Sequence, residues 1–409
     1  MEAIRQWALG LLVTLCACAS GAVTHAAAQD ARAPDAAPPA PSSPLPDVYG
    51  APMSPTMSAG GGSPPATPPT AATPRDSSSW NALPILSYSR ETELAFGGFA
   101  VRYFRIGDAP PESRPSFLAA AVTISTRAQV FADVYPELWW DHERWLVSGQ
   151  LAYRRIPDYF FGIGNDTRAA DREQYTLHTF WSRFDLRYRA WKALFVGARH
   201  ELQWHELRDL EHAPLLSSGT VRGAEGGVRH GVGPTLVWDS RDNTLAPHGG
   251  LYYQASFLVF GGFLGSDYDY ARLTLDARHY LALAPTQTLA VEVFLDALAG
   301  DVPFNQLAQL GGVVRMRGYY EGQYRDKSYA MAQVEYRVMP LFWRLGAVVF
   351  AGLGEVSERW RDFSLEGLKW AVGAGLRYAL NVEERIHVRL DAGVGPGTWG
   401  VDVNILEAF

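Results

Sequence analysis

The chain has 409 residues, of which 47% are hydrophobic, 12% aromatic and 19% charged. This composition is too apolar for a disordered protein, and the length suffices for one large domain or two ordinary ones. The formal net charge of −7 argues against a nucleic-acid partner, because neutralising phosphates requires a basic face.

The first 28 residues resemble a secretory signal peptide. Arg5 precedes an apolar stretch over residues 7–23, which runs into three alanines that end at Ala28. A charged start, an apolar core and a small-residue exit are typical of a cleaved export signal, so cleavage is expected after Ala28. The alternative is a lipoprotein signal whose acylation box, residues 15–18, ends at Cys18, and lipidation of Cys18 stays open. Cleavage after Ala28 would remove both cysteines of the chain.

Residues 29–79 consist mainly of Pro, Ala, Ser, Gly and Thr. Thirteen of the 26 prolines of the chain fall in this segment. Such a composition buries too little apolar surface to offset chain entropy and favours extended conformations. The segment is predicted to be a disordered tether, too short and too Pro-rich to form a folded periplasmic domain.

From residue 80 onward, apolar and polar residues alternate with a period of two. In residues 386–394 the apolar set is Ile386, Val388, Leu390, Ala392 and Val394, and the polar set is His387, Arg389 and Asp391. Residues 271–278 and 330–338 alternate in the same way. Because successive side chains of a strand point to opposite faces, each segment is predicted to be a strand with one apolar and one polar face.

Sixteen such strands can be placed between residues 80 and 409. They are expected near residues 84–90, 94–105, 116–126, 128–140, 144–154, 174–189, 192–205, 229–240, 250–261, 267–282, 286–298, 328–338, 344–351, 368–380, 384–394 and 400–409. The connections sort by parity into short turns, such as residues 189–192, and long excursions at residues 155–173, 206–228, 299–327 and 352–367. Short turns at one end and long loops at the other are typical of an outer-membrane barrel.

A soluble antiparallel sheet would also alternate, so further features are needed to decide. The strands are about ten residues long, which suffices to cross a bilayer at a tilt. The chain also carries an export signal. Aromatic residues gather at the ends of the strands, as an interfacial girdle requires: Tyr103, Trp139, Trp140, Trp191, Trp204, Trp238, Tyr252, Tyr280, Trp343 and Trp399. The uncharged stretch 249–266 fits a strand and a turn better than a spanning helix, since it contains Gln254 and paired glycines. We therefore predict an all-β fold, a sixteen-stranded antiparallel transmembrane β-barrel over residues 80–409.

The long stretch 299–327, between the eleventh and twelfth strands, contains the main candidate functional residues. Gly311 and Gly312 precede an Arg317-Gly318-Tyr319 tip, a pattern that suits a loop folded back into a confined space. An arginine inside the barrel needs a carboxylate, because desolvating an unpaired guanidinium is costly. The alternative is that these residues belong to an outer loop in water.

These motifs resemble the BamA/TamA-type assembly barrels, also called the bacterial surface antigen family. Residues 316–319 are similar to the Val-Arg-Gly-Phe/Tyr loop tip of that family. The resemblance covers residues 80–409 and also rests on residues 159–165, residues 238–243 with Pro247 and Gly249, the Gly311-Gly312 pair, residues 333–337 and the terminal Phe409. The resemblance implies that the long loop enters the barrel and that Arg317 pairs with Glu335 on the twelfth strand.

Three features depart from the family pattern. The thirteenth strand has Phe350-Ala351-Gly352 where the family has Phe-x-Asp, so the second acidic partner of the arginine is missing. The expected C-terminal strand signal comprises Phe409, Ile405, Val403 and Val401, but Glu407 stands where an apolar residue is usual. Family members that insert or secrete proteins also carry periplasmic capture domains, for which residues 29–79 leave no room.

The resemblance implies a role in inserting or translocating polypeptides or lipids at the outer membrane. Expected partners are outer-membrane lipid and client outer-membrane or secreted polypeptides, and the oligomeric state stays open. The first strand is short and contains Pro84, which cannot donate to a ladder, so the seam between first and last strands is expected to be weak and open to strand addition. A passive pore or structural barrel is the alternative.

An outer-membrane hydrolase is a third hypothesis, for which Asp141-His142 or His279 would be candidates. The sequence lacks a Gly-x-Ser-x-Gly elbow and a phosphate loop, and the chain is expected not to be an enzyme. His200 and His205 resemble a zinc signature, but five residues apart on a strand they face opposite sides. No metal and no cofactor are expected.

Overall fold

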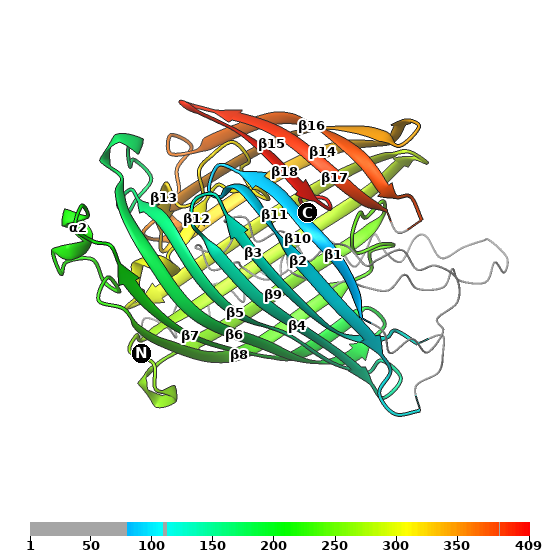
Figure 1. Ribbon diagram of the computed structural model, residues 1–409, viewed down its shortest axis with the longest axis horizontal. Coiled ribbons are helices and arrows are strands. Elements are labelled where there is room, and N and C mark those ends of the chain that lie inside the picture. Colours follow the sequence, from blue (N-terminus) through cyan, green and yellow to red (C-terminus); the bar gives the residue numbers. More distant parts are fainter. Residues whose placement is uncertain (1–79, 109–112, 384) are drawn as a thin grey trace. The chain divides into compact units, whose positions relative to one another are not determined.

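The structure, a computed structural model, describes residues 80–108, 113–383 and 385–409, and the predicted signal peptide and tether lie outside these residues. Within them, sixteen antiparallel strands form a closed barrel (Figure 1). They are β1 (Asn81–Ser89), β2 (Glu93–Phe104), β3 (Ser116–Ser125), β4 (Val130–Trp140), β5 (Trp145–Phe160), β6 (Glu173–Trp191), β7 (Leu194–Arg208), β8 (Gly227–Asp239), β9 (Gly250–Phe260), β10 (Tyr270–Ala284), β11 (Gln287–Gly300), β14 (Ser328–Phe342), β15 (Leu345–Ser357), β16 (Lys369–Asn381), β17 (Ile386–Gly395) and β18 (Thr398–Ile405). The predicted sixteen-stranded antiparallel barrel is confirmed.

Each barrel strand pairs with its neighbours in the chain, with two long-range closures. β11 pairs with β14 around the intervening loop, from Gln287 opposite Val338 to Ala297 opposite Ser328. β1 closes the barrel against β18. The loop between β11 and β14 contributes a separate two-stranded sheet of β12 (Ala308–Leu310) and β13 (Tyr324–Asp326).

The alternation of residues separates a polar interior from an apolar outer wall. On β11, Glu292 is fully buried, whereas the next residue, Val293, is 53% exposed on the outside. On β16, Arg377 is 1% exposed and Leu376 is 57% exposed. Polar residues inside and apolar residues outside are the arrangement of a barrel that faces lipid. No helix among the described residues has the length and apolar character needed to cross a membrane.

Four aromatic residues that the sequence assigned to an interfacial girdle face into the barrel, and one of them, Tyr103, is half-buried against Phe117. Trp139 is 5% exposed, Tyr252 is fully buried and Tyr280 is 2% exposed. They belong to the inward-facing set of their strands, where Tyr252 contacts the guanidinium groups of Arg241 and Arg278. The prediction was wrong for these four because an aromatic residue at a strand end does not by itself indicate a face.

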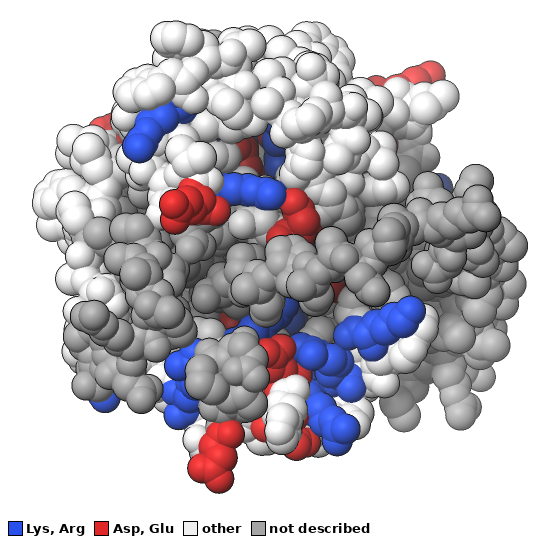
Figure 2. All heavy atoms as spheres, turned by 90° about the vertical axis from the view of Figure 1, so that its right-hand side faces the viewer, with Lys and Arg blue, Asp and Glu red and all other residues white. Residues whose placement is uncertain are grey.

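The two ends of the barrel differ in their connections. The long-loop end carries residues 161–172, 209–226, 261–269, 301–327 and 358–368, with the short helices η1 (Ala169–Asp171), α2 (Pro214–Ser217), η2 (Gly262–Leu264), η3 (Phe304–Gln306) and η4 (Trp360–Asp362). The short-turn end carries the connections between β2 and β3 and between β16 and β17, the longer segment 240–249, and the turns at residues 141–144, 192–193, 285–286 and 343–344. The separation of connections by length is incomplete, because three short turns, at residues 90–92, 126–129 and 396–397, lie at the long-loop end. In Figure 1 α2 lies at the left, so Figure 2 faces the short-turn end, where charged side chains of both signs gather around the centre.

The seam between β1 and β18 is the weakest joint of the wall. Tyr88 opposite Val403 is the one residue pair that joins these strands in the described residues. By contrast, β2 pairs with every residue of β1, from Asn81 to Ser89. If the register at Tyr88 continued, residues 82–85 would pair with residues 406–409. Those last four residues turn away from β18, so the edge of β1 that faces the seam has no partner strand over this part among the described residues.

The last four residues turn into the barrel, so the expectation that the final strand ends at Phe409 was wrong. β18 ends at Ile405, and Leu406, with φ +73°, turns the chain away from the wall. Phe409 is 4% exposed and packs against Tyr280 and Ala290 on the inner surface. Val401, Val403 and Ile405 remain on β18, on the outer side of the alternation.

Candidate functional site

The loop of residues 301–327 folds inside the barrel. Leu310 is fully buried, and Phe304, Met316 and Tyr319 are at most 2% exposed. These residues share one apolar cluster with inward residues of the wall, such as Phe294 on β11. We name this segment the luminal loop. Its buried apolar side chains explain why the loop enters the barrel, since water would otherwise surround them.

Arg317 at the tip of the luminal loop contacts two carboxylates of the wall. Its Nη2 donates to Glu335 Oε2 on β14, and its Nη1 donates to Asp391 Oδ2 on β17 over 2.7 Å. The guanidinium carbon lies 3.6 Å from the ring centroid of Phe350 on β15. All three charged side chains are at most 1% exposed. A guanidinium so deeply buried is tolerated because two carboxylates and an aromatic face surround it.

Asp391 is a partner of Arg317 that the sequence reasoning missed. The family's acidic residue on β15 is replaced here by Gly352, which lies against Met316 of the loop. Phe350 of the same strand stacks on the guanidinium. The acid comes instead from β17, two strands farther along the wall. The alternation had placed Asp391 on the polar face. Which luminal group it meets depends on the curvature of the closed barrel, which the sequence does not contain.

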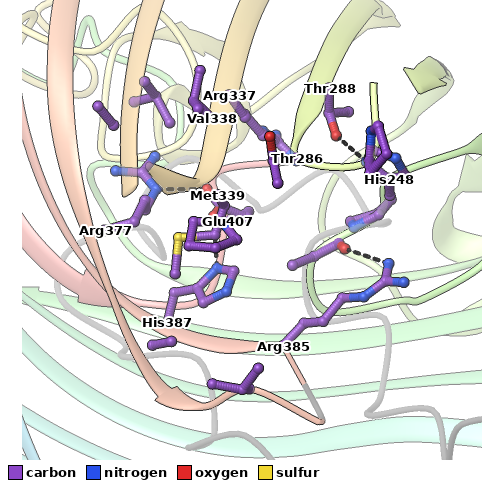
Figure 3. Close-up of a pocket in the computed structure, with 18 of the residues that line it drawn as sticks. His248, Thr286, Thr288, Arg337, Val338, Met339, Arg377, Arg385, His387 and Glu407 are labelled. Atoms are coloured by element: carbon purple, nitrogen blue, oxygen red, sulfur yellow. Dashed lines mark hydrogen bonds and ion pairs between the residues drawn. The ribbon is translucent and has the colours of Figure 1, made fainter. Parts of the chain in front are cut away.

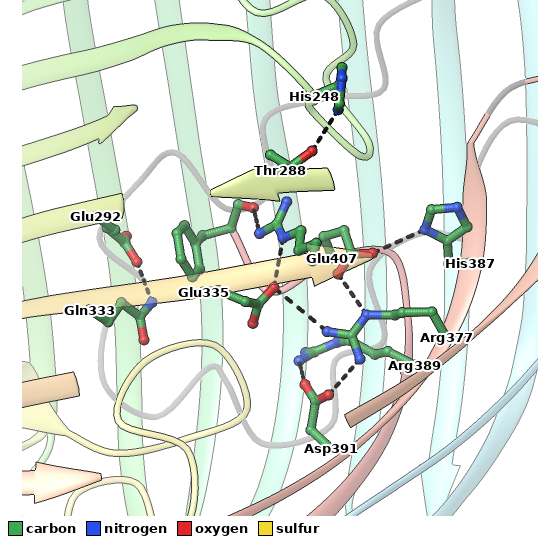
Figure 4. Close-up of polar contacts among 12 residues, drawn as sticks. His248, Thr288, Glu292, Gln333, Glu335, Arg377, His387, Arg389, Asp391 and Glu407 are labelled. Atoms are coloured by element: carbon green, nitrogen blue, oxygen red, sulfur yellow. Dashed lines mark hydrogen bonds and ion pairs between the residues drawn. The ribbon is translucent and has the colours of Figure 1, made fainter. Parts of the chain in front are cut away.

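Further arginines extend this cluster toward the short-turn end (Figure 4). Arg377 Nη1 donates to Asp391 Oδ1 over 2.5 Å, and its Nε donates to Glu407 Oε2 over 2.7 Å. Arg389 Nη1 donates to Asp391 Oδ2 over 2.9 Å. Arg337 Nε donates to Glu335 Oε1 over 2.7 Å. Glu335 and Asp391 each contact more than one guanidinium, so the cluster acts as a network rather than as separate pairs.

The contacts of Glu407 explain why a glutamate stands where the C-terminal pattern has an apolar residue. In addition to Arg377, its carboxylate contacts His387 Nδ1 at 3.0 Å. The carbonyl oxygen of Phe409 accepts a hydrogen bond of 2.7 Å from Arg337 Nη2. A residue of a lipid-facing strand would be apolar at this position, but here the polar side chain turns into the lumen.

The glycines of the loop tip allow a tight fold. Gly311 and Gly312 have φ values of +109° and +103°, and the Gly312 amide donates to the Tyr319 carbonyl oxygen over 3.1 Å. Gly318 has φ +105°, a conformation that side-chain-bearing residues rarely adopt. Tyr319 Oη donates to the main-chain oxygen of Trp370 on β16 over 2.9 Å. The tip therefore meets the wall through main-chain groups as well as through Arg317.

Gly393 on β17 gives the loop tip room to approach the wall. A Cβ atom at this position would collide with the main-chain oxygen of Arg317 and lie 2.7 Å from its carbonyl carbon. The clash is with backbone, which cannot rotate away. The backbone of the loop tip therefore touches the backbone of β17, and only glycine fits at this contact.

The loop tip also bridges the two sides of the seam. The Gly318 carbonyl oxygen accepts from Arg90 Nη1, after β1, over 3.0 Å and from Thr398 Oγ1, at the start of β18, over 2.7 Å. Arg90 Nη1 also donates to Thr398 Oγ1 over 3.1 Å. We call these three residues the seam clasp. The clasp joins segments that the β1–β18 ladder leaves almost unconnected.

A second sequence motif, residues 159–165, lies over the luminal loop. The Gly164 amide donates to the Arg325 carbonyl oxygen over 2.8 Å. The Phe160 ring lies 5.1 Å from that of Phe304, and the Phe161 ring lies 5.5 Å from that of Tyr320. The structure therefore brings this motif and the loop tip motif, separate in sequence, into one packed unit.

The histidines considered for metal or catalysis lie apart from this site. His205 is 1% exposed and faces inward, whereas His200 lies on the outer face, with its Nε2 2.7 Å from that of His230. His142 is in an exposed turn beside Asp141. His279 is exposed on the outer side of β10. Within the described ranges no group of three or more His, Cys, Asp and Glu residues could hold a metal ion.

The sequence of this wall and loop matches a known family model. Residues 114–383, more than half of the chain, match the Omp85 superfamily domain. The chain belongs to the Omp85 superfamily. The resemblance found in the sequence is thereby confirmed, and the protein is an outer-membrane β-barrel of this superfamily. No curated protein sequence matches the chain.

Solved structures resemble this Omp85 barrel in fold. BamA from Haemophilus ducreyi lacking POTRA domains 1–3 matches with a TM-score of 0.57 and 13% identity, over 80% of this chain and 70% of that one. CdiB from Escherichia coli matches with a TM-score of 0.54 and 13% identity, over 81% of this chain and 63% of that one. At this identity the likeness establishes the fold alone.

Proposed function

We propose that this Omp85 barrel inserts or translocates polypeptides at the outer membrane. The observation that carries the proposal is the seam, where β1 and β18 share a single residue pair, Tyr88 opposite Val403. A strand edge with unused backbone donors and acceptors accepts an added strand. The client would be an outer-membrane or secreted polypeptide, whose strand would pair with β1 while lipid surrounds the wall.

In this mechanism the luminal loop controls the seam. Arg317, Gly318, Tyr319, Gly311 and Gly312 anchor the loop, and Glu335 is the luminal counter-charge. The anchored tip presents the Gly318 oxygen to Arg90 and Thr398 on the two sides of the seam. Movement of the tip would release both contacts together, so a client strand would enter after the loop shifts.

A disulfide across the seam tests the proposal. Tyr88→Cys with Val403→Cys places cysteines at directly opposed positions, within reach of a disulfide. The double variant is made with Cys16 and Cys18 replaced by Ala, so that no other thiol is present. We expect the oxidised protein to lose activity in depleted cells, measured as recovery of the outer-membrane proteome, and reduction to restore it.

The matched control is Leu376→Cys with Leu390→Cys, an opposed pair with exposed side chains on β16 and β17. This disulfide should leave activity intact, because it locks two strands that are already fully paired. Full activity with the Tyr88–Val403 seam locked would overturn the role of the seam. A large steady current in planar bilayers would instead favour the passive pore, since a loop-filled lumen conducts poorly.

The export of the chain belongs to the same proposal. Residues 1–28 act as a cleaved signal peptide and residues 29–79 as a disordered tether that precedes the barrel. N-terminal sequencing of the membrane-inserted protein should begin at Gln29. A mature chain that begins at Cys18 and carries acyl groups would indicate the lipoprotein alternative.

A further inference from the structure

A cavity of about 210 Å³ lies at the short-turn end of the barrel (Figure 3). The turn of residues 240–249, the turn of residues 285–286 and the C-terminal tail border it, together with the adjacent ends of β14 to β17. Pro247, Met339, Pro340 and Trp343 form an apolar part of its lining. A single buried water needs about 10–15 Å³ by this kind of measure, so the cavity has room for a polyatomic ligand.

The rest of the lining is rich in cationic side chains. Arg337, Arg377 and Arg385 line the cavity, and Glu407 is the acidic residue among the described residues that border it. The carboxylates that pair with Arg337 and Arg385, which are Glu335 and Asp242, do not line the cavity. Each of the three arginines is ion-paired, so the wall offers guanidinium N–H groups rather than unbalanced charge, and the imidazoles of His248 and His387 lie beside them.

Two buried donors of this wall have no hydrogen-bond partner among the described residues. Arg337 is 5% exposed, and its Nε and Nη2 donate to Glu335 and to the Phe409 carbonyl oxygen. Its Nη1 makes no hydrogen bond within the described part of the chain. Arg377 Nη2 likewise makes no hydrogen bond and lies 3.8 Å from Glu335 Oε1. Both nitrogens are enclosed by protein atoms, so the donors that a ligand in the cavity would meet are the other polar groups of its wall.

The turn that carries His248 is held in place by its own side chains. Asp242 Oδ1 accepts from the main-chain amides of His248 and Gly249, and its Oδ2 accepts from Arg385 Nη1 over 2.6 Å. His248 Nδ1 lies 2.6 Å from Thr288 Oγ1. Arg385 and His248 are therefore fixed beside the cavity without taking part in the ion-pair network around Arg317. The end of β8 and this turn include residues 238–243, Pro247 and Gly249, a sequence motif that has no contact with the seam or the loop tip in the interactions described above.

We propose that this cavity binds a phosphate group. Guanidinium groups bind phosphate through paired N–H donors, and the nearby imidazole and threonine hydroxyl groups provide further donors for a tetrahedral oxyanion. The group belongs either to inorganic phosphate or to a phospholipid headgroup, whose acyl chains would leave along the apolar side. This site does not depend on the insertion activity proposed above.

Calorimetric titration of the full-length barrel in phosphate-free detergent tests the proposal, with inorganic phosphate as the probe at constant ionic strength. We expect saturable binding that is about tenfold weaker in Arg385→Gln, which removes the positive charge, and in His248→Ala, which removes the imidazole donor. Both variants leave the contacts of Arg317 untouched. The matched control is Arg344→Gln, which removes a half-buried arginine of the neighbouring turn that does not line the cavity.

A second titration identifies the source of the phosphate, with dihexanoyl phosphatidic acid as the probe below its micelle concentration. Tighter binding of this lipid than of inorganic phosphate, weakened by the same two variants, assigns a headgroup site. Tighter binding of inorganic phosphate assigns a free-anion site. Absence of binding in both titrations, or equal binding by all three variants and the parent, would overturn the proposal.

Discussion

Arg90 and Gly318 are 228 positions apart in the chain, yet the guanidinium of Arg90 donates to the carbonyl oxygen of Gly318 over 3.0 Å. Arg90 follows the first strand of the barrel, and Gly318 lies at the tip of the luminal loop. Thr398, at the start of the last strand, donates to the same oxygen. The loop tip thus contacts both sides of the seam at the long-loop end.

Arg90→Ala should loosen the seam without unfolding the barrel. The substitution removes charge-assisted hydrogen bonds to Gly318 and Thr398, each with a free energy of about 1.5–3 kcal/mol. We expect amide hydrogen exchange in β18 and in residues 85–89 to become about tenfold faster. Arg102→Ala, at an exposed arginine of β2, is the control. Unchanged exchange in Arg90→Ala would rule out the clasp.

Arg317→Ala should destabilise the folded barrel. The substitution leaves Glu335 and Asp391 buried with one guanidinium fewer, at a cost on the order of 3 kcal/mol in the free energy of unfolding. The temperature at which the barrel loses its heat-modifiable band on gels should fall. The transition temperature of Arg317→Lys should lie between those of the parent and Arg317→Ala. An ammonium group keeps the charge but cannot bridge two carboxylates as a fork. Unchanged heat-modifiability together with unchanged growth would remove the anchor role.

Gly393→Ala should displace the loop tip while leaving the wall intact. The added Cβ would collide with the main-chain carbonyl group of Arg317, and neither backbone can yield cheaply. Labelling of a Tyr319→Cys reporter by a water-soluble maleimide should therefore become faster in the Gly393→Ala background. Gly98→Ala on β2, where a Cβ would meet open space, provides the matched control. Equal labelling rates in both backgrounds would contradict the close contact.

Glu407→Gln should weaken the C-terminal tail in a pH-dependent way. Burial alone would raise the pKa of Glu407, but Arg377, the hydrogen bond from His387 and Arg337 together hold that pKa well below its usual range. The unfolded chain therefore binds a proton at higher pH than the folded barrel does. The ion pair stabilises the fold fully above the ordinary glutamate pKa of about 4.3, and this stabilisation is lost as pH falls through the lower folded value.

Thermal unfolding in detergent would measure this effect. At pH 7 the Gln variant should be less stable than the parent by about 3 kcal/mol, and the gap should close as the pH falls below 4. Glu366→Gln, in an exposed loop, should show no such gap at either pH. Equal stability of the Glu407→Gln variant and the parent at pH 7 would mean that the tail is held by packing alone.

The sequence by itself determined the wall of this protein. The alternation of residues such as Leu376, Arg377, Leu390 and Asp391 is a local property of the strand, so it revealed sixteen strands and their inward faces without any tertiary information. The motif of residues 316–319 likewise indicated which loop enters the barrel. Both signals are carried by neighbouring residues and need no knowledge of how the barrel closes.

Only the tertiary structure decided which inward residues meet. The pairing of Arg317 with Asp391, the inward turn of residues 406–409 and the gathering of Arg337, Arg385 and His248 around one cavity depend on register and closure. Such contacts join residues distant in the chain, and their distances follow from the tilt and curvature of the whole barrel. A strand pattern fixes the face of a side chain, whereas its partner across the lumen is set by the closed wall.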